Sequence, residues 1–210
     1  MTRGRFITIE GGEGAGKSTQ QKIVVEAVAH AGFEAVATRE PGGAAGADEI
    51  RALLLNGAPE RWDAVSEALL MVAARRRHLV ETVWPALERG AWVICDRFSD
   101  STIAYQGYGG GVPLERLAEL HHLIAGDFHP DLTLILDVPV ELGLERAARR
   151  GGERRFEMKG AAFHKRVRQG FREIAAKEPQ RCALIDARAD VGAVSGAILA
   201  VLHDRLALPS

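Results

Sequence analysis

The sequence has few cysteines and no long hydrophobic run, and both features narrow the class of protein. Of its 210 residues only Cys95 and Cys182 carry thiols, each in a short apolar run, so we expect two buried, reduced cysteines rather than a disulfide. The longest apolar stretches, such as 68–74 and 191–202, are shorter than the ~20 residues that span a bilayer. The apolar run near the N-terminus is too short for a signal peptide. We therefore expect a cytoplasmic protein with no membrane partner.

Neither sign of charge is in excess, and the histidines form no metal-binding pattern. The 27 Lys and Arg residues nearly cancel the 28 Asp and Glu residues, which leaves a net charge of −1. General nucleic-acid binders depend on a strongly positive surface, so we expect no nucleic-acid partner. The seven histidines lack the spacings of zinc sites, so no metal cage made of protein ligands alone is expected. Any anion-binding site must therefore depend on a few nearby positive groups rather than on the charge of the whole protein.

Short apolar runs alternate with helical patterns along the whole chain. Strand-like runs occupy 6–10, 34–38, 92–96, 132–137 and 182–186, and helical patterns occupy 17–31, 48–55, 65–88, 113–125, 140–150, 161–177 and 191–206. Strands that alternate with helices form parallel sheets, and continuously apolar strands are covered on both faces. We therefore predict an α/β fold with three layers. At roughly 150 residues per domain, the 210 residues predict one domain, 1–210.

Glycine clusters and one proline mark the expected interruptions. Clusters at 42–46, 107–111 and 151–152 are typical of loops. Pro85 falls inside the helical pattern 65–88 and predicts that this helix kinks or restarts there.

The sequence GGEGAGKS, residues 11–18, has the spacing of a phosphate-binding loop between a predicted strand and a predicted helix. Its glycines let successive backbone N–H groups point into one concavity, and the helix N-terminus adds partial positive charge. Lys17 would reach the β- and γ-phosphates of a nucleoside triphosphate, and Ser18 would offer its hydroxyl to Mg²⁺. The expected ATP-binding residues are Gly11, Gly12, Glu13, Gly14, Ala15, Gly16, Lys17, Ser18 and Thr19. The alternative is a glycine-rich turn that binds nothing.

Charged residues end two other predicted strands. Asp96 closes one strand, where a carboxylate would help to hold Mg²⁺, although it could also be a simple cap. Arg97 follows it, and Arg39 ends another strand. Because ligands of parallel sheets bind at the carboxyl edge, both arginines predict a second anion site beside the triphosphate.

The second anion site favours phosphoryl transfer to a nucleoside monophosphate. A GTPase would need a guanine-selecting N-K-x-D segment, yet the only asparagine, Asn56, precedes a glycine. A monophosphate presents an oxygen that is already ionised, so positioning and positive charge are sufficient. The predicted lid at about 149–160 contains four arginines, Arg149, Arg150, Arg154 and Arg155. They could close over the phosphates, or form only a solvated basic turn.

Taken together, the segments IEGGEGAGKST, TREPGG, VICDRFSDSTIAYQGYG, PDLTLILDV, RRFE and LIDA resemble bacterial thymidylate kinases in order and spacing. The resemblance covers nearly the whole chain. It implies a P-loop fold with a five-stranded parallel sheet, transfer of the γ-phosphoryl group of ATP to dTMP with Mg²⁺, a role in dTTP biosynthesis, and a homodimer.

The resemblance also implies roles for individual residues. Arg39 and Arg97 would bind the acceptor phosphate, and Arg75 and Thr102 would read thymine. Tyr105 would crowd the sugar 2′ position, with Gln106 beside it. Glu13 would contact the 3′-hydroxyl or the waters of the metal. Arg150 and Arg155 match the family's lid arginines, which supply transition-state charge. The residues expected to act in catalysis are Lys17, Arg97, Arg150, Arg155 and Glu13. The residues expected to bind dTMP are Arg39, Met71, Arg75, Arg97, Thr102, Tyr105 and Gln106. The expected metal ligands are Ser18 and Asp96.

Three positions depart from the family pattern. Met71 stands where a phenylalanine usually stacks on thymine, Arg154 where an aspartate is common, and Phe171 where a tyrosine is frequent. Met71 could also be a core residue. Two other functions stay open at this point: a kinase for another nucleoside monophosphate, and a non-catalytic nucleotide-binding module. A plain ATPase would turn over without an acceptor.

Overall fold

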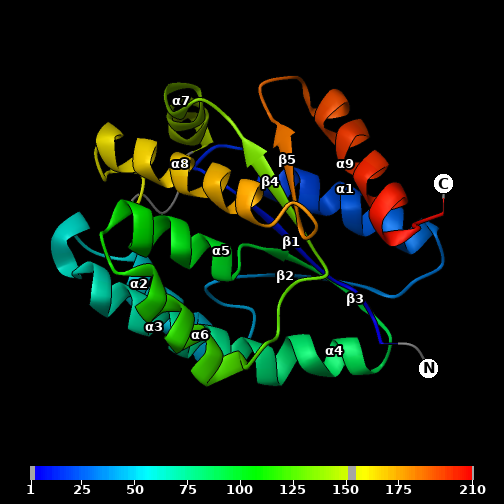
Figure 1. Ribbon diagram of the computed structural model, residues 1–210, viewed down its shortest axis with the longest axis horizontal. Helices are drawn as coiled ribbons and strands as arrows, with labels where there is room; N and C mark the ends of the chain where they lie inside the picture. The colour runs from blue at the N-terminus through cyan, green and yellow to red at the C-terminus, as the bar shows by residue number, and fades with distance from the viewer. Residues whose placement is uncertain (1–2, 151–154, 210) are drawn as a thin grey trace.

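The computed structural model describes the backbone of residues 3–150 and 155–209, and all of their side chains except that of Arg150. The expected loop at 151–152 and the side chains of Arg150 and Arg154 lie outside this part of the chain. The described residues form a three-layer α/β structure (Figure 1).

The central sheet has five parallel strands in the order β2-β3-β1-β4-β5. The strands are β1 (Phe6–Gly11), β2 (Ala35–Arg39), β3 (Trp92–Asp96), β4 (Leu132–Asp137) and β5 (Cys182–Asp186). The predicted bounds are confirmed for the last three and differ by one residue at the ends of the first two. The parallel sheet predicted from the alternating pattern is therefore confirmed.

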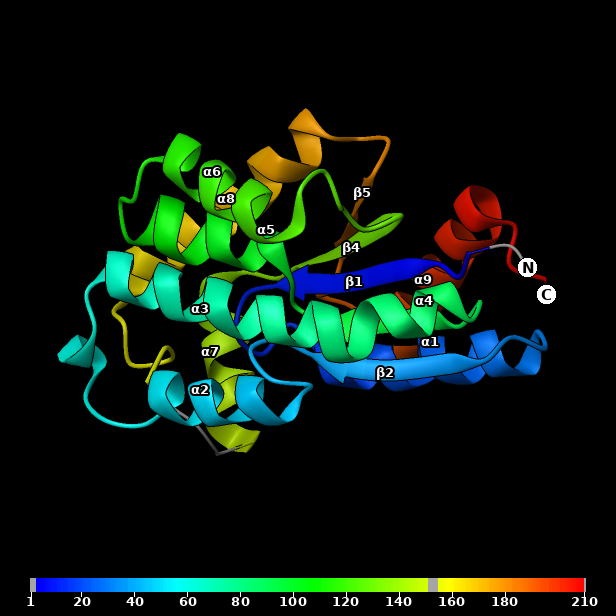
Figure 2. The same ribbon diagram turned by 90° about the horizontal axis from the view of Figure 1, so that it is seen from below.

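Helices cover both faces of this sheet (Figures 1 and 2). On one face, α1 (Lys17–His30) and α9 (Val191–Leu206) share a core cluster with residues of β1, β3, β4 and β5. The opposite face carries α4 (Trp84–Glu88) and α8 (Ala161–Lys177) over residues of β1, β3 and β4. The apolar strands are thus buried on both sides, as their lack of alternation predicts.

The remaining helices are α2 (Ala45–Leu55), η1 (Pro59–Arg61), α3 (Ala64–His78), α6 (Leu114–Ala125) and α7 (Val140–Arg150). The predicted interruption near Pro85 is a π-helical segment, η2 (Leu79–Val83), between α3 and α4. Pro85 lies in the first turn of α4, where the missing N–H of proline is tolerated.

One predicted loop is wrong. Residues 107–109 of the glycine cluster belong to a helical segment formed by α5 (Ser99–Thr102) and the π-helical η3 (Ile103–Gly109). A Cβ at Gly109 would lie 2.6 Å from the Phe163 ring, and one at Gly107 would lie 2.5 Å from a methyl of Leu114. These glycines therefore let helices approach closely instead of forming a flexible turn.

Two further expectations can be compared with the structure. Both Cys95 and Cys182 are buried and free, as expected. Within the described ranges, no helix combines the length and the apolarity that crossing a membrane requires.

Candidate active site

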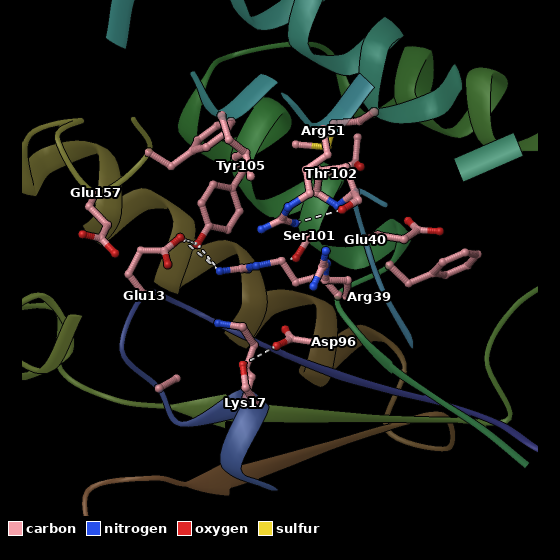
Figure 3. Close-up of a pocket in the computed structure, with 18 of the residues that line it drawn as sticks. Glu13, Lys17, Arg39, Glu40, Arg51, Asp96, Ser101, Thr102, Tyr105 and Glu157 are labelled. Carbon is pink, nitrogen blue, oxygen red and sulfur yellow. Dashed lines mark hydrogen bonds and ion pairs between the residues drawn. The ribbon is translucent and has the colours of Figure 1, made fainter. Parts of the chain in front are cut away.

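The carboxyl edge of the sheet opens into a cavity of about 470 Å³ (Figure 3). Its wall brings together the turn after β1, the ends of β2 and β3, and parts of α3, α5 and η3. The predicted site residues that line it are Glu13, Gly14, Ala15, Gly16, Lys17, Ser18, Arg39, Met71, Arg75, Asp96, Arg97, Thr102, Tyr105 and Gln106. Gly11, Gly12, Thr19 and Arg155 are not among the residues that line it.

The turn after β1 is a backbone cradle that only glycine fits. Gly11, Gly14 and Gly16 all have positive φ angles. A Cβ at Gly14 would lie 1.9 Å from the carbonyl oxygen of Gly143, so the loop rests directly on the backbone of α7. At Gly12 and Gly16 an added Cβ would enter open space. Gly16 lines the cavity, so a side chain at this position would occupy space beside the loop that is otherwise left for phosphates.

Lys17 and Ser18 begin α1 at this cradle. The Lys17 ammonium donates to the carbonyl oxygens of Gly11 at 3.2 Å and Gly12 at 2.8 Å. Burial, reinforced by the nearby Arg97, lowers the pKa of Lys17 to about 8. A lysine that is buried and close to a second cation gains strongly from an anion.

The Ser18 hydroxyl donates to the Asp96 carboxylate at 2.8 Å. These hard oxygen ligands suit Mg²⁺, which keeps several waters and uses one or two protein ligands together with substrate phosphates. No group of three or more His, Cys, Asp or Glu side chains within the described part of the chain could hold a metal alone. The residues present therefore fit a magnesium ion that arrives with a nucleotide.

Arg97 occupies a left-handed turn directly after β3, with φ 74°. Its guanidinium donates to Gly11 O, to the Ser101 hydroxyl, to the Tyr105 hydroxyl and to Glu13. Non-glycine residues adopt this conformation at a cost, and such strain is concentrated at functional sites. The turn aims Arg97 at the phosphate-binding loop.

Glu13 lies between two hydrogen-bond donors. Arg97 donates to its Oε1 atom at 3.0 Å, and the Tyr105 hydroxyl donates to the same oxygen at 2.7 Å (Figure 3). Burial alone would raise the pKa of Glu13, but Arg97 and Lys17 outweigh it and lower this pKa to about 2. Glu13 is therefore a permanent carboxylate, suited to accept hydrogen bonds and unsuited to donate a proton.

Glu10, the acidic residue of β1, does not line the cavity but binds two residues that do, Phe98 and Ser101, and the sequence analysis did not single it out. Its carboxylate accepts from the backbone N–H of Phe98 at 2.7 Å and from the Ser101 hydroxyl at 2.6 Å. Burial, with a smaller contribution from Asp100, raises the pKa of Glu10 to about 7. The available signal was a carboxylate in an otherwise apolar strand, FITIE.

Arg75 is buried at the part of the cavity wall formed by α3. It donates to Glu40 at 2.7 Å and to the Thr102 hydroxyl at 2.9 Å, and its guanidinium lies 4.9 Å from the centre of the Phe98 ring. His78 approaches the other oxygen of Glu40 at 3.0 Å. Glu40 and His78 were also missed by the sequence reasoning, because nothing in the sequence connects them to Arg75.

Two further expectations for arginines are met. Arg76 and Arg77 are exposed and Arg75 alone of the three lines the cavity, as their spacing on one helix predicts. Arg39 ends β2 beside Asp96 in the register of the sheet, and its exposed guanidinium lies 3.6 Å from Asp48. Arg39 and Arg97 thus reach the same cavity from neighbouring strands.

Met71 has properties of both alternatives considered for it. It lines the cavity, and it is half-buried against the core cluster that contains Tyr105 and Phe156. Gln106 is almost fully buried and donates its amide to Glu67 at 3.0 Å.

Arg155 lies away from the cavity in this structure, and its predicted role as a lid arginine stays a prediction. Its side chain is fully buried and pairs with Glu67 at 2.7 Å. The same guanidinium donates to backbone carbonyl oxygens of Leu54, Ala58, Pro59 and Trp62. These acceptors hold its charge on α3 and on the chain between α2 and α3. The predicted role of Arg150 falls on a side chain outside the described part.

The comparisons with known proteins agree with this geometry. The thymidylate kinase family model matches residues 9–198. This chain belongs to the thymidylate kinase family. A thymidylate kinase of Caulobacter vibrioides is 55% identical over 208 residues, which are 99% of this chain and 100% of the relative. One from Nitrobacter hamburgensis is 52% identical over 98% of this chain and 91% of the relative.

A solved structure supports the same assignment. The crystal structure of thymidylate kinase from Ehrlichia chaffeensis matches with a TM-score of 0.79 and 36% identity, over 95% of this chain and 99% of that one. Both the resemblance to this family and the P-loop fold with its five-stranded parallel sheet are therefore confirmed.

Proposed function

We propose that this chain transfers the γ-phosphoryl group of ATP to dTMP, giving dTDP and ADP for dTTP synthesis. The observation that carries the proposal is one continuous cavity whose wall includes both the phosphate-binding loop and the arginines expected to bind the acceptor, Arg39, Arg75 and Arg97. Lys17 lies at the loop, whereas Arg75 and Met71 come from α3. A donor and an acceptor bound in this cavity would bring their phosphates together near Arg97.

The chemistry asks for positive charge and exclusion of water, and for no general base. The phosphate oxygen of dTMP is already ionised, so it attacks the γ-phosphorus directly as the bond to the ADP oxygen breaks. Lys17 would meet the charge between the β- and γ-phosphates, and Arg97 would hold the acceptor phosphate. Ser18 and Asp96 would hold Mg²⁺, which neutralises phosphate charge when it is bound. Glu13, already ionised, would accept a hydrogen bond from the 3′-hydroxyl of dTMP or from a water molecule bound to the metal.

The base would be read by Arg75 and Thr102, which line the same cavity. Glu40 fixes the Arg75 guanidinium and leaves it beside the Thr102 hydroxyl, so that fixed donors face the space predicted for thymine. Tyr105 would lie against the sugar, because its hydroxyl is held by Glu13 and Arg97.

A coupled assay of ADP release tests this function. It compares dTMP with dUMP, dCMP, dGMP and AMP at equal concentration, with ATP and Mg²⁺. We expect dTMP to give the highest kcat/KM. A preference for another monophosphate would reassign the acceptor, and ADP release without any acceptor would favour an ATPase. No turnover with any of them would favour a nucleotide-binding module.

We extend the proposal to a homodimer in the cytoplasm. Val65, Leu69 and Ala73 lie about one helical turn apart along α3, and Val80 lies two turns further on in η2. All four are exposed, and Leu123 of the neighbouring α6 is 79% exposed. An exposed apolar stripe of this kind is typical of a subunit interface. Sedimentation velocity should show a dimer, and Leu69→Asp should shift it to a monomer. A monomeric unmodified protein at micromolar concentration would exclude the dimer.

A further inference from the structure

Glu67 is a buried carboxylate that connects two parts of the molecule through separate oxygens. It lies on α3, and its side chain is 1% exposed. Its Oε1 atom accepts from Arg155 at 2.7 Å and from Lys159 at 2.6 Å. Its Oε2 atom accepts from the Gln106 amide of η3 at 3.0 Å. Burying a carboxylate is costly, and two cations with an amide donor offset that cost.

The Oε2 contact determines which end of the Gln106 amide is available to the cavity. An ionised carboxylate can only accept hydrogen bonds, so it selects the NH₂ group of Gln106. Gln106 lines the cavity, and its carbonyl oxygen is the polar atom left for a ligand there. That oxygen can accept from an N–H or O–H group of the acceptor nucleotide.

The Oε1 contacts hold the segment 155–159 against the same cavity. Phe156, between the two cations that bind Glu67, lines the cavity and packs edge-on to Tyr105 with ring centres 5.8 Å apart. The Arg155 guanidinium and the Lys159 ammonium lie 5.2 Å and 4.9 Å from the centre of the Phe156 ring. Glu67 therefore fixes the side of the cavity formed by Phe156 as well as the Gln106 amide.

We propose that Glu67 is a positioning residue for the acceptor nucleotide, coupling the segment 155–159 to Gln106 through one carboxylate. This inference rests on the proposed function, because it assigns Glu67 to the site that holds dTMP. Both oxygens belong to one carboxylate. A change in the Oε1 contacts with the segment 155–159 therefore alters the orientation and charge that Oε2 presents to Gln106, and the reverse also holds. Acceptor binding at Gln106 and docking of the segment at Lys159 should therefore depend on each other.

A double-mutant cycle tests the coupling while Glu67 itself is kept. Lys159→Met removes one cation, and Gln106→Met removes the amide with little change in length. We expect each variant to weaken dTMP binding in calorimetric titrations. The increase in the dissociation constant of dTMP for the double variant should be smaller than the product of the two single increases, by at least about 3-fold. Because Lys165 is an exposed lysine that contacts Glu141, Lys165→Met combined with Gln106→Met is the control and should show no coupling.

Variants of Glu67 give a second measurement. A glutamine at 67 can satisfy the cations only through its oxygen, so its NH₂ group faces Gln106 and the Gln106 amide must turn over. Glu67→Gln should raise the KM for dTMP about 5- to 20-fold, with the KM for ATP changed less than 2-fold, and Glu67→Asp should recover part of the loss. A merely structural role would affect both substrates alike.

Three results would overturn the proposal: multiplicative effects of Lys159→Met and Gln106→Met on dTMP binding, equal coupling in the Lys165 control, or equal changes in both KM values for Glu67→Gln. If Glu67→Gln does not fold, the cycle alone decides. If the wild-type protein turns over dTMP but the Lys159→Met and Gln106→Met effects show no coupling, the proposed function is unaffected and only the role of Glu67 is rejected. A wild-type protein that turns over no dTMP contradicts the function itself.

Discussion

The Arg97 guanidinium donates to the Glu13 carboxylate at 3.0 Å, joining the turn after β3 to the phosphate-binding loop. Both side chains are largely buried, at 16% and 14% exposed. The pair keeps Arg97 oriented through the protein's own contacts. Donors that are fixed in advance need little reorganisation when charge develops on a phosphate, which is how such sites stabilise transition states.

Arg97→Ala should raise the KM for dTMP at least about 10-fold and lower kcat on the order of 10²-fold. The variant removes the donor proposed for the acceptor phosphate and leaves the negative charge of Glu13 without its guanidinium partner. Steady-state kinetics at saturating ATP measure both effects. An unchanged KM for dTMP would contradict the role of Arg97 in acceptor binding.

Lys17→Ala should abolish phosphoryl transfer and leave the fold intact. Among the described residues Lys17 donates to two loop carbonyls alone, so we expect its main contribution to be to charge on the triphosphate. Lys22→Ala, an exposed lysine on the same helix, is the matched control. Far-UV circular dichroism should be unchanged for both. More than about a tenth of wild-type kcat in Lys17→Ala would refute this role.

Met71→Phe should lower the dissociation constant of dTMP by about 2–10-fold, or roughly 0.4–1.4 kcal/mol, without affecting ATP. A flat ring stacks on a base better than a thioether, which also has more rotatable bonds to order. Calorimetric titration checks this. Met71 also packs on the cluster that contains Phe156, so unchanged affinity with a lower Tm would assign it to the core instead.

Arg155→Met should lower the Tm by about 5–15 °C, because breaking a fully buried ion pair costs about 3–5 kcal/mol. The remaining Glu67 charge would keep only Lys159 as a cationic partner. Arg149→Met is the control, since Arg149 is an exposed arginine paired with Glu145. Thermal unfolding by calorimetry compares the two. A stable Arg155→Met variant with strongly reduced kcat would support the catalytic role inferred from the sequence.

Glu10 should make the folded state less stable as the pH rises from about 5 to 7. Its pKa is raised to about 7, so the folded protein binds a proton that the unfolded chain releases above its ordinary value of 4.5. Ionisation in this window therefore opposes folding, by about 1 to 3 kcal/mol. Denaturant titrations at several pH values should show this slope. Glu10→Gln should remove it, because its amide oxygen can accept from the Phe98 N–H while its NH₂ group donates to the Ser101 oxygen, and it carries no ionisable proton.

Two groups near Glu10 titrate outside this window, but His121 titrates inside it. Burial lowers the pKa of His121 below its ordinary 6.5, which makes stability rise with pH inside the window. The contribution of Glu10 is therefore the difference in slope between the wild type and Glu10→Gln. Glu13, with its pKa lowered to about 2, affects stability below its ordinary pKa of 4.5. Lys17, with its pKa lowered to about 8, affects stability between about pH 8 and its ordinary pKa of 10.5. A slope between pH 5 and 7 that persists in Glu10→Gln would show that other groups cause it.

The sequence by itself determined the fold class and much of the candidate site. Strand-and-helix alternation predicts the parallel sheet, and the spacing of residues 11–18 predicts the phosphate-binding loop, because both are local patterns. Arg39 and Asp96 could be placed together because each ends a parallel strand, and such ends meet at one edge.

Only the tertiary structure decided which donors bind the buried carboxylates. Glu10, Glu40 and Glu67 are far in sequence from Ser101, Arg75 and Arg155, and no local pattern joins them. The same holds for Arg155, which the lid pattern assigned to phosphates and the fold pairs with Glu67. A buried charge takes whichever partner the packing brings within hydrogen-bond distance, and that depends on how α3, η3 and the segment 155–159 come together in space.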